Sequence, residues 1–291
     1  MAYFFSKALE AFLNLAMARM EAGLGSALLL SGPPGGGKTS FARAFAEKLG
    51  APLFYYSGSP DKERDLLYEI DVQGVLRREN AWVPGPAWQA FEKSNSGYAV
   101  LLIDEVDKTN PGFDAFLLRL LEDWTFRSPD GKEIKANPAR LAVVLTSNGR
   151  RKLRPEVMRR CQRVSVPLPE DGRMQEIIRQ IAGTEIPGKM LDLIIRIGRA
   201  VGGDNEENAP SPKEMAMCCV DIISLHEGGE NDPEVWREVA ASWLTKEGGP
   251  AHLDRVTGFR WARALREETR NAPWLSGVAD TRLSDRGAGV G

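Results

Sequence analysis

Five short and mostly apolar runs recur in the first 166 residues, and each has the length of a buried strand. Continuous apolar runs of this kind indicate strands that are buried on both faces. That burial is typical of a parallel sheet covered by helices. The predicted strands are residues 27–30, 52–56, 98–103, 141–145 and 163–166.

The stretches around these runs have helical periodicity instead. Residues 39–49 and 114–124 each carry one apolar face, and an amphipathic helix near the N-terminus has its apolar positions at Leu9, Phe12, Leu13, Ala16 and Met20. Strands that alternate with helices predict an α/β fold, in which a five-stranded parallel sheet lies between two helical layers.

Beyond Pro169 the strand pattern stops, and the periodic segments are all helical. We therefore expect a second, small all-helical unit. The predicted domains are residues 1–169 for the α/β unit, 170–245 for the helical unit and 246–291 for a C-terminal extension that is helical and then frayed. Two units also agree with the length of 291 residues, because one hydrophobic core rarely organises so long a chain.

Charge and cysteine content restrict the function. The chain has 38 basic and 40 acidic residues and a net charge of −2, so no global basic field attracts nucleic acid.

Its three cysteines, Cys161, Cys218 and Cys219, have no metal-binding spacing, and we interpret the adjacent pair as buried apolar residues. Charges at Lys7, Glu10 and Arg19 argue against a signal peptide or a membrane span. A reduced, cytoplasmic setting fits this pattern.

A glycine-rich segment directly after the first apolar run has the spacing of a nucleotide phosphate loop. Its glycines let backbone N–H groups turn toward an anion, Lys38 can reach the outer phosphates of ATP, and the Thr39 hydroxyl can ligate Mg²⁺. The helix that follows favours phosphate at its N-terminus. We expect the nucleotide to contact Gly32, Pro33, Pro34, Gly35, Gly36, Gly37, Lys38, Thr39 and Ser40.

Polar residues end two of the other predicted strands. Asp104 and Glu105 follow the apolar residues 100–103, at the sheet edge where α/β proteins bind ligands. We expect Asp104 to hold Mg²⁺ and Glu105 to orient or deprotonate the attacking water. Asn148 ends the next strand and can hydrogen-bond the γ-phosphate or the water. An acidic turn and a turn-forming asparagine are the structural alternatives.

In order and spacing, these segments resemble the nucleotide-binding and hydrolysis motifs of AAA+ ATPases. The resemblance spans about residues 25–245 and includes residues 146–148 and 153–161. Within AAA+ the chain is most similar to the MoxR group, through residues 82–88, 159–161 and 211–213. The resemblance implies a P-loop αβα sandwich followed by a helical lid domain.

A further implication of the resemblance is a ring, usually of six subunits, with ATP at each boundary. Arg160, or its neighbour Arg159, would then act as the arginine finger for the next subunit, although a basic surface turn is the alternative. Lys213 departs from the family pattern, which commonly has arginine at this second sensor position. A lysine keeps the charge but loses the planar fork, so it would contact the γ-phosphate less specifically, and a plain surface lysine near a helix start is the alternative.

Two segments resemble the insertions of this group, residues 71–82 and 126–139, and residues 128–132 within the second read as a hairpin turn. By family analogy such loops lie at the ring pore. Arg77, Arg78, Asn80 and Trp82 are the residues expected to contact a client there. Ordinary exposed loops are the alternative.

Our leading hypothesis for function is an ATP-driven, MoxR-like chaperone that remodels or activates a partner protein. By family association the client is a protein with a von Willebrand A domain or a metalloenzyme. A nucleic-acid motor or loader of the AAA+ class is the main alternative, and a nucleotide-dependent switch and a small-molecule kinase are two others. The segment 246–291, with Trp261, Trp274 and several arginines, can pack internally or present a basic surface.

Overall fold

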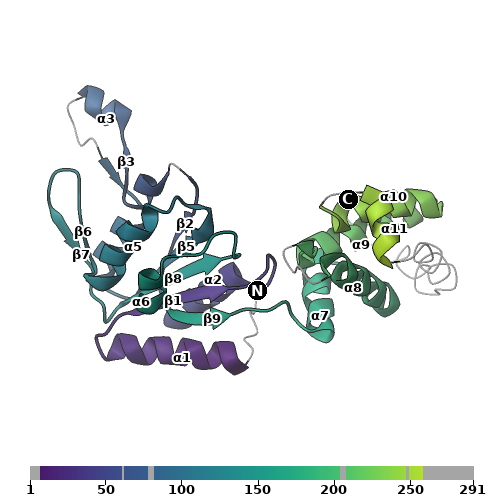
Figure 1. Cartoon of the computed structure of the whole chain (residues 1–291), viewed down its shortest axis with the longest axis horizontal. Helices are drawn as coiled ribbons and strands as arrows, with labels where there is room; N and C mark the ends of the chain where they lie inside the picture. The colour runs from purple at the N-terminus through teal and green to yellow at the C-terminus, as the bar shows by residue number, and fades with distance from the viewer. Residues whose placement is uncertain (1–6, 61, 78–81, 204–207, 247–248, 258–291) are drawn as a thin grey trace, which may run out of the picture. The chain divides into compact units, whose positions relative to one another are not determined.

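The computed structural model describes residues 7–60, 62–77, 82–203, 208–246 and 249–257 (Figure 1). Two compact units divide the chain, Met1–Pro167 and Leu168–Gly291, and each is described by itself. The predictions for Arg78, Asn80, Trp261 and Trp274 lie outside the described residues.

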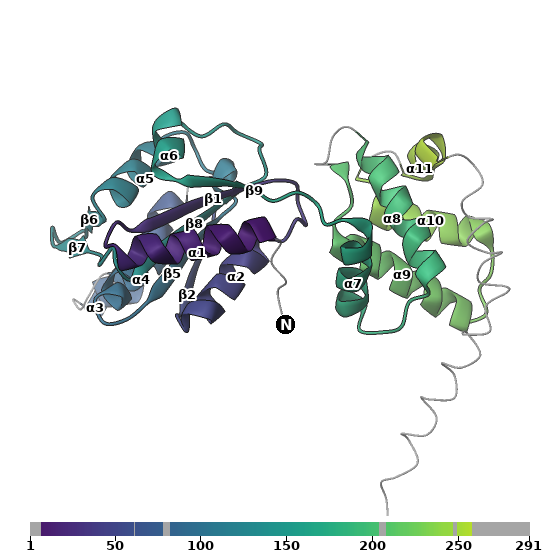
Figure 2. The same ribbon diagram turned by 90° about the horizontal axis from the view of Figure 1, so that it is seen from below.

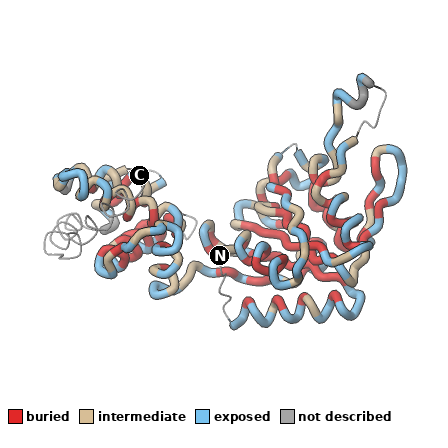
Figure 3. Tube along the Cα trace, turned by 180° about the vertical axis from the view of Figure 1, so that it is seen from behind, coloured by how far each residue is buried: buried red, intermediate tan, exposed pale blue. Residues whose placement is uncertain are grey.

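The first unit is built on a five-stranded sheet with the order β2-β5-β8-β1-β9. All of its neighbouring strands pair in parallel. Each predicted apolar run forms one of these strands, which are β1 (Ser26–Ser31), β2 (Leu53–Ser57), β5 (Ala99–Asp104), β8 (Leu141–Ser147) and β9 (Gln162–Ser165). The central strands β8, β5 and β1 are buried along nearly their whole lengths (Figure 3).

Two helices cover one face of the sheet, α1 (Lys7–Glu21) and α2 (Lys38–Leu49) (Figure 2). Leu13 of α1 and Phe41 of α2 are fully buried there, against alternate residues of the strands such as Val100 and Val144. Burying each such side chain stabilises the fold by roughly 1.5 to 3 kcal/mol. The apolar stripe predicted for the N-terminal helix therefore faces the sheet.

The opposite face of the sheet is covered by α4 (Pro86–Ser94), α5 (Phe113–Glu122) and α6 (Pro155–Arg160). Phe91 of α4, Leu117 of α5 and Val157 of α6 pack with the other alternate strand residues, including Leu101. Pro86 begins α4 at a position where the missing N–H costs nothing. Helices on both faces leave only the strand ends open for ligands, which is why the site forms at an edge.

Two small antiparallel hairpins extend from the first unit. In one, β3 (Tyr68–Ile70) and β4 (Trp82–Pro84) flank α3 (Val72–Arg77), and this insertion projects away from the sheet (Figure 1). In the other, β6 (Thr125–Arg127) pairs with β7 (Glu133–Lys135) around the predicted turn. Two 3₁₀ turns, η1 (Glu63–Leu66) and η2 (Val106–Lys108), complete the unit.

The second unit is helical throughout its described part. It consists of α7 (Asp171–Ala182), α8 (Gly188–Gly202), α9 (Pro212–Glu227), α10 (Pro233–Leu244) and α11 (Gly249–Thr257). Trp236 of α10 and Leu253 of α11 are fully buried in its core. A capping box between Ser211 and Glu214 fixes the start of α9. Because Leu253 belongs to this core, helical packing continues past residue 245.

The predicted fold class is confirmed: a parallel five-stranded αβα sandwich precedes an all-helical region. All three cysteines are buried, and burial raises the pKa of Cys161 and of Cys219 to about 12. Burial also raises the pKa of the adjacent Cys218. Among the described residues, no helix combines the length and the apolar character that crossing a membrane requires.

Candidate functional site at the edge of the sheet

The glycine-rich segment forms the turn between β1 and α2. Gly37 stands at the N-cap of α2 with a φ of 92°, a backbone conformation that favours glycine. Gly32 has no room for a side chain, because an added Cβ would lie 2.1 Å from the carbonyl oxygen of Val166. The loop therefore needs glycine at both positions, and it brings backbone N–H groups to the N-terminus of α2.

Lys38 lies inside this turn. Its ammonium group donates to the carbonyl oxygens of Gly32 and Pro33, both at 2.7 Å, and the residue is 7% exposed. Burial lowers the pKa of Lys38 below its usual value, and the carboxylates of Asp104, Asp107 and Glu105 act in the opposite direction. A buried ammonium next to a phosphate-binding turn is suited to pair with an anion.

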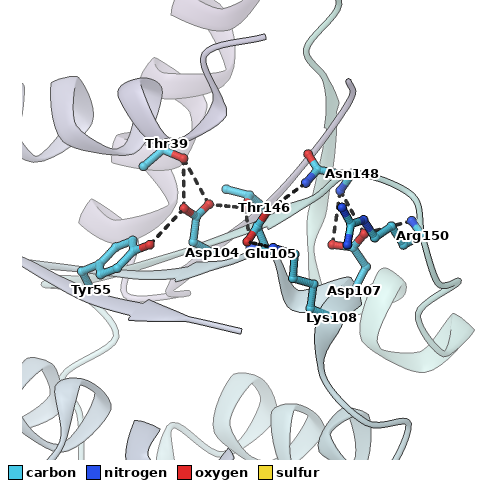
Figure 4. Close-up of polar contacts among 9 residues, drawn as sticks. All are labelled: Thr39, Tyr55, Asp104, Glu105, Asp107, Lys108, Thr146, Asn148 and Arg150. Carbon is cyan, nitrogen blue, oxygen red and sulfur yellow. Dashed lines mark hydrogen bonds and ion pairs between the residues drawn. The ribbon is translucent and has the colours of Figure 1, made fainter. Parts of the chain in front are cut away.

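Asp104, at the end of β5, is the centre of the polar contacts (Figure 4). The Thr39 hydroxyl donates to its carboxylate at 3.1 Å, and the Thr146 hydroxyl donates at 2.5 Å from the end of β8. Tyr55 of β2 adds a contact at 3.4 Å. Three parallel strands and the first turn of α2 thus converge on one carboxylate, as expected for the carboxyl ends of such strands.

Glu105 follows in a left-handed backbone conformation, with a φ of 53°. Its N–H donates to the Thr146 hydroxyl at 2.8 Å, which holds this turn against β8. One carboxylate oxygen accepts from Lys108 at 2.5 Å and the other from the side-chain amide of Asn148 at 3.2 Å. A non-glycine residue rarely adopts this conformation, and such strain is concentrated at functional sites.

Behind this edge, a second cluster ties the turn after β5 to the loop after β8. Asp107 is 4% exposed and accepts from the backbone N–H groups of Asn148 and Arg150 (Figure 4). Arg151 forms a two-pronged ion pair with the fully buried Asp114, at 2.8 and 3.0 Å. Both contacts cross between segments that are about forty residues apart in sequence.

The structure brings together Lys38, Thr39, Asp104, Glu105 and Asn148 through the contacts above. Arg159 and Arg160 lie apart from that cluster, exposed in the last turn of α6, where Arg160 pairs with Glu122. Lys213 belongs to the second unit, where it is exposed at the start of α9.

Four contributors were not predicted as site residues: Tyr55, Thr146, Lys108 and Asp107. Signals for two of them were present. Thr146 is a polar residue at the end of an apolar run, and Asp107 follows Asp104 and Glu105 within a short acidic segment. Lys108 and Tyr55 gave no signal of their own, because their contacts depend on the 3₁₀ turn and on the pairing of β2 with β5.

The residues at this edge fit a magnesium ion. Mg²⁺ prefers oxygen donors and is usually held by one or two protein groups together with phosphate oxygens and water. The hydroxyl of Thr39 and the carboxylate of Asp104 are oxygen donors within 3.1 Å of each other, beside the phosphate loop. Among the residues that the structure describes, no group of three or more acidic, histidine or cysteine side chains is arranged to hold a metal ion.

Comparison with known proteins agrees with this geometry. Residues 27–161 match the family model of the AAA domain (dynein-related subfamily), a range that begins in β1 and ends after α6. The matched range, a little under half of the chain, is similar to an AAA domain. This range includes the phosphate loop, Asp104, Glu105 and Asn148, so the polar cluster at the sheet edge lies within the matched residues.

Two relatives and one solved structure are also similar to this chain. Protein NorQ of Paracoccus denitrificans is 28% identical over 165 residues, which is 54% of this chain and 58% of NorQ. Lon protease of Leptospira interrogans is 36% identical over 88 residues, 30% of this chain but only 10% of that protein. The structure of NtrX from Brucella abortus, solved in complex with ATP, has a TM-score of 0.53 at 15% identity, covering 92% of this chain and 61% of NtrX. At this identity the NtrX likeness shows the fold alone.

Proposed function

We propose that this AAA+ chain binds ATP with Mg²⁺ and hydrolyses it at the edge formed by β1, β5 and β8. The observation that carries the proposal is the contact between Thr39 of the phosphate loop and Asp104 of β5, at 3.1 Å. It joins the phosphate-binding turn to the acidic strand end in one site. An ordinary glycine-rich surface turn would not be expected to contact a carboxylate at the end of another strand.

Each residue has a proposed role. Residues Gly32 to Ser40 bind the phosphates through backbone N–H groups and through the Lys38 ammonium. Thr39 and Asp104 would hold Mg²⁺, which supplies charge neutralisation at the phosphates when bound. Glu105 accepts a proton from, or orients, the attacking water, and Asn148 positions the same water or the γ-phosphate.

We further propose that the protein works as a homo-oligomeric ring, most simply a hexamer. Arg160 or Arg159 would reach the ATP of the neighbouring subunit, and an arginine of this kind is worth roughly 10³ to 10⁵ in rate. Their position supports this role, because both are exposed in the last turn of α6 while α6 itself is anchored by the buried Val157. Lys213 is proposed as a second sensor from the helical unit.

As its biological action, we propose a MoxR-like chaperone activity on a protein client in the cytoplasm. The match to NorQ, which takes up similar shares of both chains, supports this subgroup. The insertion that carries α3 also supports a protein client, because it exposes four large apolar residues, Ile70, Val72, Leu76 and Val83, beside the polar Glu69 and Gln73. Apolar side chains suit a protein surface better than a phosphate backbone. A von Willebrand A domain partner follows only from the family resemblance.

Trp82 is less suited to the client contact that was predicted for it. The residue is half-buried, and its ring packs edge-on against Tyr68 at 5.3 Å between centroids, across the base of the insertion. We therefore propose that Trp82 supports the insertion, and that the exposed apolar residues nearer α3 contact the client.

The Glu105→Gln variant tests the proposal, because it keeps the size and hydrogen-bonding reach of the side chain but removes its basicity. ATP binding should be retained and turnover should fall by about 10² or more, measured by phosphate release from the assembled protein. Unchanged turnover would refute hydrolysis at this site. Strong stimulation of the wild type by single-stranded or duplex DNA would instead favour the nucleic-acid motor.

A further inference from the structure

A buried carboxylate holds the loop that carries Asn148. Asp107 lies in η2, two residues after Glu105, and is 4% exposed. Both of its oxygens lie 3.2 Å from the backbone N–H of Asn148, and Oδ2 also accepts the N–H of Arg150 at 2.9 Å (Figure 4). A buried carboxylate needs such donors, and charge-assisted bonds to backbone N–H are among the stronger hydrogen bonds.

The loop has the shape that this contact requires. Gly149, between the two donating residues, has a φ of 87°, which turns the N–H groups on either side toward one point. The N–H of Gly149 itself donates elsewhere, to the Ser147 hydroxyl at 3.1 Å. The N–H groups of Asn148 and Arg150 form an anion-binding concavity in this way, and the carboxylate of Asp107 occupies it.

A reciprocal contact runs from the loop back to the turn. Arg151 donates to the carbonyl oxygen of Val106 at 3.4 Å and to the Thr109 hydroxyl at 3.2 Å, while Asp114 pairs with the same guanidinium. Glu105 directly precedes this turn, and Asn148 begins the loop. We call the contacts of Asp107 and Arg151 that join the turn to the loop the clasp. The clasp sets the separation between the side chains of Glu105 and Asn148, which is 3.2 Å from Asn148 Nδ2 to Glu105 Oε1.

We infer that Asp107 is a positioning residue for ATP hydrolysis, which acts by fixing the backbone of residues 148–150 so that the Asn148 amide faces Glu105. The inference rests on the proposed function of Glu105 and Asn148. Asp107 contacts neither nucleotide nor water in this role. A displacement of about 1 Å at a reacting group can cost about 10² in rate, so a small movement of this loop is sufficient to matter.

The test is a double-mutant cycle on the full-length assembled protein. Asp107→Asn keeps the size of the side chain but places an N–H₂ group opposite a backbone N–H. We expect kcat to fall by about 10- to 100-fold while KM for ATP changes by less than about twofold. In the Asn148→Ala background, the same substitution should lower kcat by less than about twofold, because the positioned side chain is already absent.

An equal factor for Asp107→Asn in both backgrounds would overturn the inference, and so would a loss of ATP affinity in place of turnover. Ser94→Ala is the matched structural control. Ser94 is fully buried, accepts the N–H of Asn137 at 2.8 Å and belongs to α4, so its loss should lower stability and leave kcat unchanged. The Glu105→Gln variant distinguishes a failure of the proposed function from a failure of this inference. If Glu105→Gln is active, the proposed function is contradicted. If Glu105→Gln is inactive but Asp107→Asn is fully active, only the role of Asp107 is contradicted.

A measurement on the wild type keeps the inference testable if Asp107→Asn does not fold. The amide protons of Asn148 and Arg150 should exchange slowly with solvent, although the Arg150 residue is exposed. Hydrogen exchange followed by NMR reports each of them separately. Exchange of both protons at the rate of an unprotected loop would show that Asp107 does not hold the backbone.

Discussion

Arg160 and Glu122 form an ion pair within one subunit, with 2.5 Å between Arg160 Nη2 and Glu122 Oε1. The pair joins the last turn of α6 to the last turn of α5, and its side chains are 38% and 54% exposed. If Arg160 is the finger that reaches the neighbouring subunit, its guanidinium must leave Glu122 before it can contact a phosphate. Glu122 then competes with the neighbour's ATP.

Replacing Glu122 by glutamine should therefore raise the ATPase rate of the assembled protein. An exposed pair contributes at most about 1 kcal/mol, so the increase should not exceed about fivefold. It should be largest at low salt, because dissolved ions already weaken the pair in the wild type. Steady-state phosphate release at two ionic strengths measures both effects.

Glu176→Gln is the control for this change in charge. Glu176 also pairs with an arginine, Arg173, on a helix surface, but this pair lies in α7 of the second unit. Its substitution should leave the rate unchanged. A Glu122→Gln enzyme no faster than the wild type, combined with an inactive Arg160→Ala enzyme, would mean that the finger acts without restraint from Glu122. An active Arg160→Ala enzyme would remove Arg160 from the finger role.

The strands were predictable because burial on both faces leaves a strong local signal. Residues 141–145 are apolar without interruption, and in the structure β8 is buried along its whole length. The order of the strands left no such signal: β1 and β2 are consecutive in sequence, yet β8 and β5 lie between them. That order depends on pairing between distant segments, which no local pattern encodes.

The candidate site divides in the same way. Lys38, Thr39, Asp104 and Glu105 were predictable, because backbone cradling of phosphate requires a recognisable spacing of glycine, lysine and threonine. The contacts of Asp107 with the loop after β8 were not predictable, because its partners are backbone N–H groups, which every residue except proline has. The short strands β3 and β4 were also missed, because three residues are too few to show a period.

ATP affinity should fall as the pH is raised toward 10.5, the ordinary pKa of lysine. Burial already lowers the pKa of Lys38 in the nucleotide-free protein, so Lys38 loses its proton before a free lysine would. Bound phosphates favour the charged form and raise this pKa again, and binding in that pH range therefore takes up a proton. Calorimetric titration in two buffers of different protonation enthalpy measures the uptake directly.

The folded protein itself should respond to pH with the opposite sign. Above the lowered pKa and below 10.5, the unfolded chain binds more protons at this residue than the folded chain does, so the contribution of Lys38 to stability rises with pH. Lys38→Met is the control, and its residual ATP binding should lack both the pH dependence and the proton uptake. An affinity that is flat with pH in the wild type would contradict the prediction.

The buried pair of Asp114 and Arg151 makes the first unit sensitive to a single substitution. Asp114 is fully buried and accepts three hydrogen bonds, two from the Arg151 guanidinium and one from the backbone N–H of Arg154 at 2.8 Å. Asp114→Ala leaves the Arg151 charge, whose side chain is 19% exposed, without its carboxylate. Loss of one partner of a buried pair lowers the free energy of unfolding by about 3 to 5 kcal/mol.

Urea denaturation, with hydrogen exchange to assign each transition to a unit, should place this loss in the first unit alone. Asp171→Ala is the matched control, because Asp171 pairs with Arg199 in the second unit, where the two side chains are 58% and 42% exposed. Its cost should stay below about 1 kcal/mol. Replacing both Asp114 and Arg151 with apolar residues should recover part of the stability, since no unpaired charge then remains buried. Equal costs for Asp114→Ala and Asp171→Ala would show that burial does not decide the strength of this pair.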